Sequence, residues 1–289
     1  MQEGSIRHIE NFPSHYVTPR NIDVWLPPGY TATKKYAVLY MQDGRSLFDS
    51  SITWNKQEWG LDETMGRLIR EKRIRNCIVV GIWNAEQYRH NEYLPQKPFE
   101  MLTPEEQDTI LTARRSRGQP VFGARDIRSD NYLRFLVKEL KPYIDSSFST
   151  YRDMRNTFIG GSSMGALLAL YALCEYPEVF RGAACLSTHW PGIFRTTNNP
   201  FPAAMMRYLE ERLPAPGIHR IYTDRGTATT DTLYPVYAVQ AGQLLHKKGY
   251  DSLSWWNITF KGADHSENAW RKRLAVPLGF LLAPDRFGK

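Results

Sequence analysis

The sequence predicts one α/β domain, with a mostly parallel central sheet, helices on both faces and an antiparallel hairpin at the N-terminus. Two observations lead to this prediction. After residue 36, short apolar runs typical of strands buried on both faces alternate with segments of helical apolar spacing. Before it, residues 5–26 alternate polar and apolar positions, as antiparallel hairpins do, and Pro27-Pro28-Gly29 ends that pattern.

The apolar patterns also place the individual elements. We expect strands at 36–41, 77–82, 156–160, 183–187, 218–222 and 253–260. We expect helices at 57–71, 131–144, about 164–175, 202–212, 233–248 and 266–282. Parallel strands need a crossover connection, usually a helix, so this alternating order favours parallel pairing.

Residues 84–130 interrupt the regular pattern. Charges are dense there, a short helix is expected at 104–114, and four prolines punctuate the segment: Pro95, Pro98, Pro104 and Pro120. Irregular segments of this length in compact domains are often lids or binding loops. We therefore expect a lid-like or surface excursion over one end of a single domain spanning 1–289, with a disordered insertion as the alternative.

Composition excludes several classes of protein. A hydrophobic content of 42% is that of a globular protein, and no apolar run approaches the roughly 20 residues of a membrane helix. The net charge of +7 comes from 37 basic and 30 acidic residues without a long basic block, which favours a solvated basic surface over nucleic-acid binding. Cys77, Cys174 and Cys185 show no C-x-x-C spacing, which argues against a disulfide framework or a zinc site.

The compartment and the oligomeric state stay open. Residues 1–10 are polar and show no signal peptide. The protein is expected in the periplasm or outside the cell if a leader was removed, and in the cytoplasm otherwise. A homo-oligomer is compatible with the sequence.

The pattern Gly161-x-Ser163-x-Gly165 lies between an expected strand and an expected helix. In an α/β hydrolase the nucleophilic serine occupies such a strained turn, where small neighbours are needed because the chain reverses tightly. The next N–H, that of Met164, would be free to bind an oxyanion at a helix N-terminus. A Gly/Ser loop without catalytic function is the alternative.

Catalytic partners are expected just after other strands, because ligands bind beyond the carboxyl ends of parallel strands. A serine nucleophile needs a base, and the base needs an orienting carboxylate, in the chain order Ser…Asp/Glu…His. His265 suits the base, and Asp231 or Asp224 suits the acid. His189 is a rival base, but it precedes both aspartates and fits better as a pocket residue beside Trp190.

Together these residues resemble the putative-esterase (esterase D-like) family of α/β hydrolases over roughly residues 20–283. Four stretches carry the resemblance: Met41-Gln42-Asp43-Gly44, Gly160-Gly161-Ser162-Ser163-Met164-Gly165-Ala166, Gly226-Thr227…Asp231-x-x-Tyr234-x-x-Tyr237 and Asp264-His265-Ser266-Glu267-x-x-Trp270. The family includes feruloyl and acetyl-xylan esterases of carbohydrate esterase family 1, and enterochelin esterases. The resemblance implies that the acid follows the Gly-Thr turn, which favours Asp231 over Asp224.

The resulting expectation is a serine carboxylic-ester hydrolase without cofactor or metal. Ser163 is the expected nucleophile, with the oxyanion bound by N–H groups of Met164 and of the turn at Gly44 and Arg45. The expected substrate wall consists of Trp83, Asn84, His189 and Trp190. The resemblance implies acetyl or feruloyl esters on plant polysaccharide or oligosaccharide. The alternatives are a siderophore esterase, favoured by Arg45, Arg89 and the +7 charge, and an inactive binding module.

Overall fold

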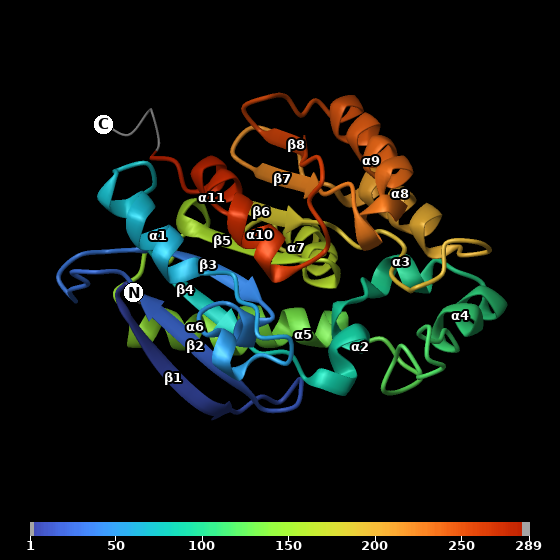
Figure 1. The fold of residues 1–289 in the computed structure, drawn as a ribbon, viewed down its shortest axis with the longest axis horizontal. Helices are drawn as coiled ribbons and strands as arrows, with labels where there is room; N and C mark the ends of the chain where they lie inside the picture. Colours follow the sequence, from blue (N-terminus) through green and yellow to red (C-terminus); the bar gives the residue numbers. More distant parts are fainter. Residues whose placement is uncertain (1–2, 285–289) are drawn as a thin grey trace.

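The computed structural model describes residues 3–284 and contains one eight-stranded sheet (Figure 1). The strands are β1 Ser5–Phe12, β2 Arg20–Leu26, β3 Ala37–Gln42, β4 Cys77–Ile82, β5 Thr157–Ser162, β6 Gly182–Leu186, β7 Arg220–Arg225 and β8 Trp255–Thr259. Their order across the sheet is β1-β2-β4-β3-β5-β6-β7-β8. β1 pairs antiparallel with β2, and β2 with β4, while the other pairs are parallel. The predicted fold class is confirmed.

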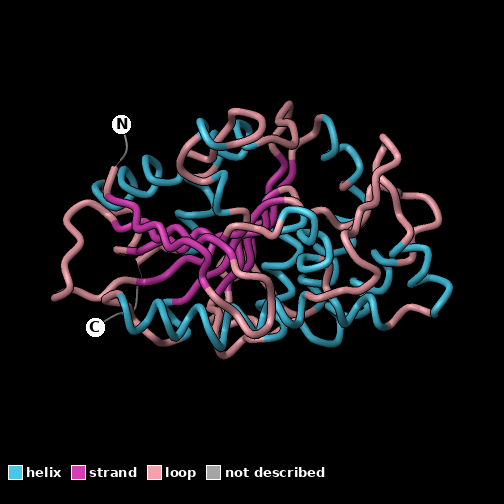
Figure 2. Tube along the Cα trace, turned by 90° about the horizontal axis from the view of Figure 1, so that it is seen from below, coloured by secondary structure: helices cyan, strands magenta, loops and turns pink. Residues whose placement is uncertain are grey.

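Helices cover both faces of the sheet, as the side view shows (Figure 2). α1 Leu61–Arg70, α10 Glu267–Arg273 and α11 Ala275–Leu281 pack on one face. The other face carries α2 Arg89–Tyr93, α3 Gln96–Glu100, α4 Pro104–Leu111, α5 Ser129–Phe135, α6 Lys141–Ser147, α7 Met164–Glu175, α8 Phe201–Arg212 and α9 Pro235–Lys247. Successive side chains of a strand point to opposite faces, so Val38 and Tyr40 of β3 join one core and Leu39 and Met41 the other.

Residues 84–130 are folded. Many of their apolar side chains belong to the core that also holds α7, among them Tyr93, Phe99, Ile110 and Phe122. Asn91 fixes the last part of the segment, because its Nδ2 donates to Ala124 O at 2.9 Å and to Asp126 O at 2.7 Å. The alternative of a disordered insertion is therefore not what the structure contains, and α2 and α3 precede the helix expected at 104–114.

The three cysteines lie in β4, α7 and β6 and belong to the core. The thiols of Cys77, Cys174 and Cys185 are buried, and burial raises their pKa values well above the usual range. Within residues 3–284, no helix has the length and apolar character needed to cross a membrane. Over the same residues, no three His, Cys, Asp or Glu side chains gather where they could hold a metal ion.

Candidate active site

Ser163 lies at a sharp turn between β5 and α7, which we call the elbow, and is half-buried there. Its backbone has φ 56° and ψ −120°, and such conformations cost a non-glycine residue about 1–3 kcal/mol. The elbow leaves no room for neighbouring side chains, because a Cβ on Gly161 would lie 2.8 Å from the carbonyl carbon of Gly165. The Ser163 N–H donates to Leu186 O at 2.9 Å and ties the elbow to β6. This is the strand–turn–helix geometry that exposes a nucleophilic serine.

Two backbone segments beside the elbow could stabilise negative charge. Met164 is the first residue of α7, so its N–H has no acceptor within the helix. Gly44–Ser46 forms a 3-10 turn after β3, and a Cβ on Gly44 would lie 2.5 Å from the backbone of β4. A Cβ on Gly165 would meet Asp43 Oδ2 at 3.4 Å, so this turn lies close to the N-terminus of α7.

Asp43 anchors the turn that contains Gly44 and Arg45. Its carboxylate accepts hydrogen bonds at 2.7 Å from Arg89 Nε, from Arg89 Nη2 and from Asn84 Nδ2. The Arg45 side chain is bound elsewhere, because its Nε donates to Ile52 O at 2.9 Å. The backbone N–H is therefore the group through which Arg45 could serve the elbow. Asn84 is one of the residues expected in the substrate wall, and its side-chain amide holds this turn by donating to Asp43.

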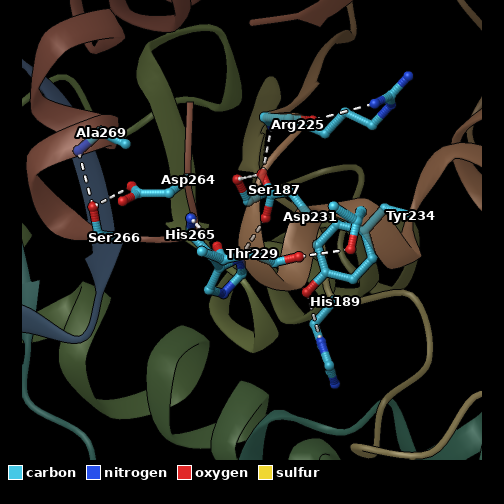
Figure 3. A network of polar contacts seen from close by, with 12 residues as sticks. Ser187, His189, Arg225, Thr229, Asp231, Tyr234, Asp264, His265, Ser266 and Ala269 are labelled. Atoms are coloured by element: carbon cyan, nitrogen blue, oxygen red, sulfur yellow. Dashed lines mark hydrogen bonds and ion pairs between the residues drawn. The ribbon is translucent and has the colours of Figure 1, made fainter. Parts of the chain in front are cut away.

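Asp231 and His265 come together at the carboxyl end of the sheet (Figure 3). Asp231 is fully buried, and its Oδ1 lies 2.5 Å from His265 Nδ1. The other carboxylate oxygen accepts from Gly226 N–H at 2.5 Å and from Ser187 Oγ at 2.6 Å. The backbone N–H of His265 donates to Thr229 Oγ1 at 2.9 Å. The His265 ring is thus fixed on one side, with 15% of its side chain exposed.

The environment keeps Asp231 ionised. Burial raises its pKa, but hydrogen bonds from His265 and Ser187 outweigh burial, and the pKa lies below its usual value. Tyr234 connects the pair to the elbow, since its ring lies 6.0 Å from that of His265. Burial and Asp231 raise the pKa of Tyr234, whereas a hydrogen-bonding contact with Ser163 lowers it. The Tyr234 ring therefore packs against the histidine, and its hydroxyl binds His189 beside the elbow.

Asp224, the other candidate acid, is engaged elsewhere. Its carboxylate accepts from Arg273 Nη2 at 3.0 Å and from Arg273 Nε at 3.1 Å. Tyr222 Oη and Ser187 N–H donate to it as well, at 2.9 and 3.0 Å. The surface pairing with Arg225 that the sequence suggested is absent, because Arg225 Nη1 donates to Gly226 O instead. Asp224 is a buried structural anion, which leaves Asp231 beside His265.

The hydroxyl of Ser187 links the two aspartates. It accepts from Arg273 Nη2 at 2.7 Å and from Trp270 Nε1 at 3.1 Å. Both lone pairs of the oxygen are then occupied, so its proton can only go to Asp231, 2.6 Å away. Ser187 holds this position with a φ of 45°, a strained value for a residue with a side chain.

His189 lies beside the elbow in a fixed tautomer. Its Nε2 lies 3.1 Å from Ile193 O, which can only accept, so the ring proton is on Nε2. Its Nδ1 then accepts from Tyr234 Oη at 2.7 Å. Burial lowers the pKa of His189 to about 3, and the ring stays neutral. The backbone N–H of His189 donates to the backbone carbonyl of Ser163 at 3.1 Å. The His189 ring lies 5.3 Å from that of the half-exposed Phe194.

The two tryptophans expected in the substrate wall lie in different surroundings. Trp190 is only 4% exposed and lines a small internal cavity with Trp255 and side chains of α9. That position supports packing rather than contact with a substrate. Trp83 is half-buried, donates from Nε1 to Asp23 Oδ2 at 2.5 Å and lies under the Arg45 guanidinium at 5.5 Å. Trp83 therefore borders the turn at Gly44.

Sequence reasoning missed three polar residues of this site. Ser187 directly follows β6, the same signal that selects the other candidates, but the apolar pattern includes it in the strand expected at 183–187. Tyr234 appeared only as part of a motif, without a role. Arg273 lies in a helix far along the chain, where nothing in the local pattern marks its contact with Asp224.

The fold is that of the α/β-hydrolase esterases. It belongs to the putative esterase family, whose model matches residues 15–281. The uncharacterized protein YbbA of Bacillus subtilis (strain 168) is 24% identical over 280 residues, covering 94% of this chain and 96% of YbbA. Membership of this family establishes that the protein is an esterase.

Solved structures share this fold over nearly the whole chain. A ferulic acid esterase has a TM-score of 0.67 at 16% identity, covering 97% of this chain and 98% of its own. The CE1 ferulic acid esterase AmCE1/Fae1A of Anaeromyces mucronatus has a TM-score of 0.62 at 19% identity, covering 98% and 91%. The enterobactin esterase FES of Shigella flexneri has a TM-score of 0.67 at 16% identity, covering 97% of this chain and 60% of its own.

Proposed function

We propose that this esterase is a serine carboxylic-ester hydrolase whose catalytic triad is Ser163, His265 and Asp231. The observation that carries the proposal is the 2.5 Å contact between the fully buried Asp231 and His265 Nδ1, close to a strained serine elbow. A carboxylate that holds Nδ1–H leaves Nε2 of the imidazole unprotonated. His265 is then able to accept the serine proton.

The mechanism follows from these positions. Ser163 Oγ attacks the ester carbonyl as His265 Nε2 takes its proton. N–H groups of Met164 and of the turn at Gly44 and Arg45 stabilise the oxyanion, where losing one donor typically costs about 10²–10³ in rate. Collapse of the intermediate expels the alcohol, which receives the proton from His265. Water, activated in the same way, then releases the acid from Ser163.

For the substrate we propose acetyl or feruloyl esters of plant polysaccharide or oligosaccharide. Ferulic acid esterases are among the structural neighbours, and AmCE1/Fae1A has been solved with ferulic acid bound. Trp83 and Asn84 border the elbow on one side in this proposal, and the half-exposed ring of Phe194, which packs on His189, forms the other side of the wall. Trp190 and His189 were both expected in the wall and are left out because both are buried.

Siderophore ester hydrolysis is the second candidate, supported by the similarity of fold to FES. The charges that suggested it from the sequence are already engaged, because Arg89 pairs with Asp43 at 2.7 Å and Arg45 lies 3.4 Å from Glu86. An inactive binding module is disfavoured by the intact contact between Asp231 and His265.

A panel of p-nitrophenyl acetate, methyl ferulate, acetylated xylan and a ferric siderophore tests both the chemistry and the substrate. Ser163→Ala should abolish hydrolysis of every ester, and a fluorophosphonate should label Ser163. Ser162→Ala is the matched control, since Ser162 lies next to the elbow but is only 4% exposed. Labelling of Ser162, or hydrolysis that survives Ser163→Ala, would remove Ser163 from the mechanism.

A further inference from the structure

A cationic side chain from the 84–130 segment, that of Arg115, packs on Phe194, whose ring neighbours His189. Arg115 belongs to a turn held by two backbone hydrogen bonds of 2.8 Å, from Arg115 N–H to Gln119 O and from Gly118 N–H to Arg115 O. Its guanidinium lies over the ring of Phe194 at 5.0 Å. Arg115 is exposed and Phe194 is 46% exposed, so a ligand can reach both.

The charge of Arg115 has no acidic partner among residues 3–284. Carboxylates of this region are paired with other cations: Asp43 with Arg89, Glu86 with Arg45, Glu92 with Arg20, Asp108 with Arg125 and Asp126 with Arg128. Arg115 also contacts His90, because Arg115 Nη2 donates to His90 Nδ1 at 3.3 Å. Burial, Arg89 and Arg115 lower the pKa of His90 well below its usual value, so His90 stays neutral. A guanidinium has five N–H donors, and most of those on Arg115 remain available to an anion.

A row of aromatic rings connects Arg115 with the proposed catalytic base. The Phe194 ring lies 5.3 Å from His189, His189 lies 5.8 Å from Tyr234, and Tyr234 lies 6.0 Å from His265. We call these four rings the ring row. The backbone N–H of His189 donates to the backbone carbonyl of Ser163, so the ring row passes beside the elbow and ends under the guanidinium. The rings of His189 and Tyr234 are buried and Phe194 is the exposed end of the row, so an arm of a bound ester that extends past His189 would meet Phe194 and Arg115.

We propose that Arg115 and Phe194 form a subsite for a carboxylate carried by the substrate several bonds from the scissile ester. This inference rests on the proposed function and narrows its substrate class to esters with a distant acidic group. Phe194 provides an apolar face for the arm, and the planar guanidinium can bind a carboxylate through two parallel hydrogen bonds. The neutral His90 beneath Arg115 offers the anion no competing charge.

Two ester series of increasing chain length test the subsite. One consists of mono-p-nitrophenyl esters of linear dicarboxylic acids, and the other of acetyl esters of ω-hydroxy acids, so that either arm can carry the carboxylate. Each member is compared with the same compound blocked as its methyl ester. We expect kcat/KM to favour the free carboxylate by about tenfold at one chain length, which is typical of one charge-assisted hydrogen bond. Added salt should reduce this ratio.

Arg115→Ala should bring the ratio of kcat/KM for the free carboxylate to kcat/KM for the blocked ester to about one, even if the substitution lowers both values by a common factor. Arg114→Ala is the matched control, because it removes the same charge from the same turn and its Nη1 donates to Gly118 O at 2.8 Å. Circular dichroism and fluorophosphonate labelling confirm that each variant is folded. A ratio of one at every chain length in both series, or a ratio that survives Arg115→Ala, overturns the subsite. An equal fall of this ratio in Arg115→Ala and Arg114→Ala overturns the subsite too.

The same data separate the two proposals. Hydrolysis of the blocked esters by the wild-type enzyme, absent in Ser163→Ala, supports the serine esterase mechanism independently of the ratio. If the blocked esters are hydrolysed without any carboxylate preference, only the subsite fails. If neither form is hydrolysed at any length, the proposed function fails first.

Discussion

Ser187→Ala tests whether the hydroxyl beneath Asp231 acts in catalysis as well as in packing. The substitution removes one of three hydrogen-bond donors to Asp231 and leaves Gly226 N–H and His265 Nδ1 in place. It also removes an acceptor from Trp270 Nε1 and from Arg273 Nη2. Arg273 keeps its two hydrogen bonds to Asp224, so Trp270 is the donor left without its acceptor.

The magnitudes follow from these partners. An unsatisfied buried donor costs about 1–3 kcal/mol, so the free energy of unfolding should fall by that amount. The pKa of Asp231 should rise toward its usual value, because Ser187 is one of the hydrogen bonds that lower it. We expect kcat to fall about tenfold, one charge-assisted hydrogen bond being worth roughly that factor. The fall should be far smaller than for the loss of the carboxylate itself.

Urea unfolding and steady-state hydrolysis of p-nitrophenyl acetate measure the two effects. Ser187→Gly is the control, since it deletes the same hydroxyl but relieves the backbone at φ 45°, worth about 1–3 kcal/mol. Both variants should lose the same factor in kcat, with the glycine variant the more stable. If Ser187→Ala is less stable but keeps full kcat, the hydroxyl is structural and the reasoning from Asp231 is refuted.

Three further outcomes are expected. Asp231→Asn should lower kcat by a factor of about 10⁴, because it leaves the imidazole in the wrong tautomer. Asp224→Asn should mainly lower the free energy of unfolding, by about 3–5 kcal/mol in urea, because the Arg273 charge stays buried beside it. The reverse ranking of the two kcat values would move the acid to Asp224. The pKa of His189 is about 3 in the folded protein and near 6.5 when unfolded. The contribution of the neutral His189 ring to the free energy of unfolding is therefore complete above pH 6.5 and is lost as pH falls toward 3. Urea unfolding at several pH values should show this loss at up to about 1.4 kcal/mol per pH unit, and an unchanged slope in His189→Gln would rule His189 out as its source. Trp190→Ala should destabilise the protein by about 3–5 kcal/mol and slow large and small esters in equal proportion, so a loss confined to large esters would return Trp190 to the substrate wall.

The sequence by itself determined the sheet, the elbow and the histidine after the last strand. These are local properties: the period of apolar residues decides between strand and helix, and a chain that reverses within a few residues requires small neighbours. The elbow shows this directly, since Cβ atoms on Gly161 and Gly165 would each come within 3 Å of neighbouring atoms. His265 follows from the rule that functional groups gather beyond the carboxyl ends of parallel strands.

Only the tertiary structure decided which aspartate meets His265 and which tryptophan faces the site. Asp224 lies in β7 and Asp231 follows that strand. Residue patterns alone left the choice between them open, although the family resemblance favoured Asp231. Arg273, 49 residues beyond Asp224, reaches it from α10 and holds it in the core, while Asp231 contacts His265. Trp190 points into the core under α9 for a similar reason. Contacts of this kind depend on how elements distant in sequence pack together, and a local pattern contains no information about them.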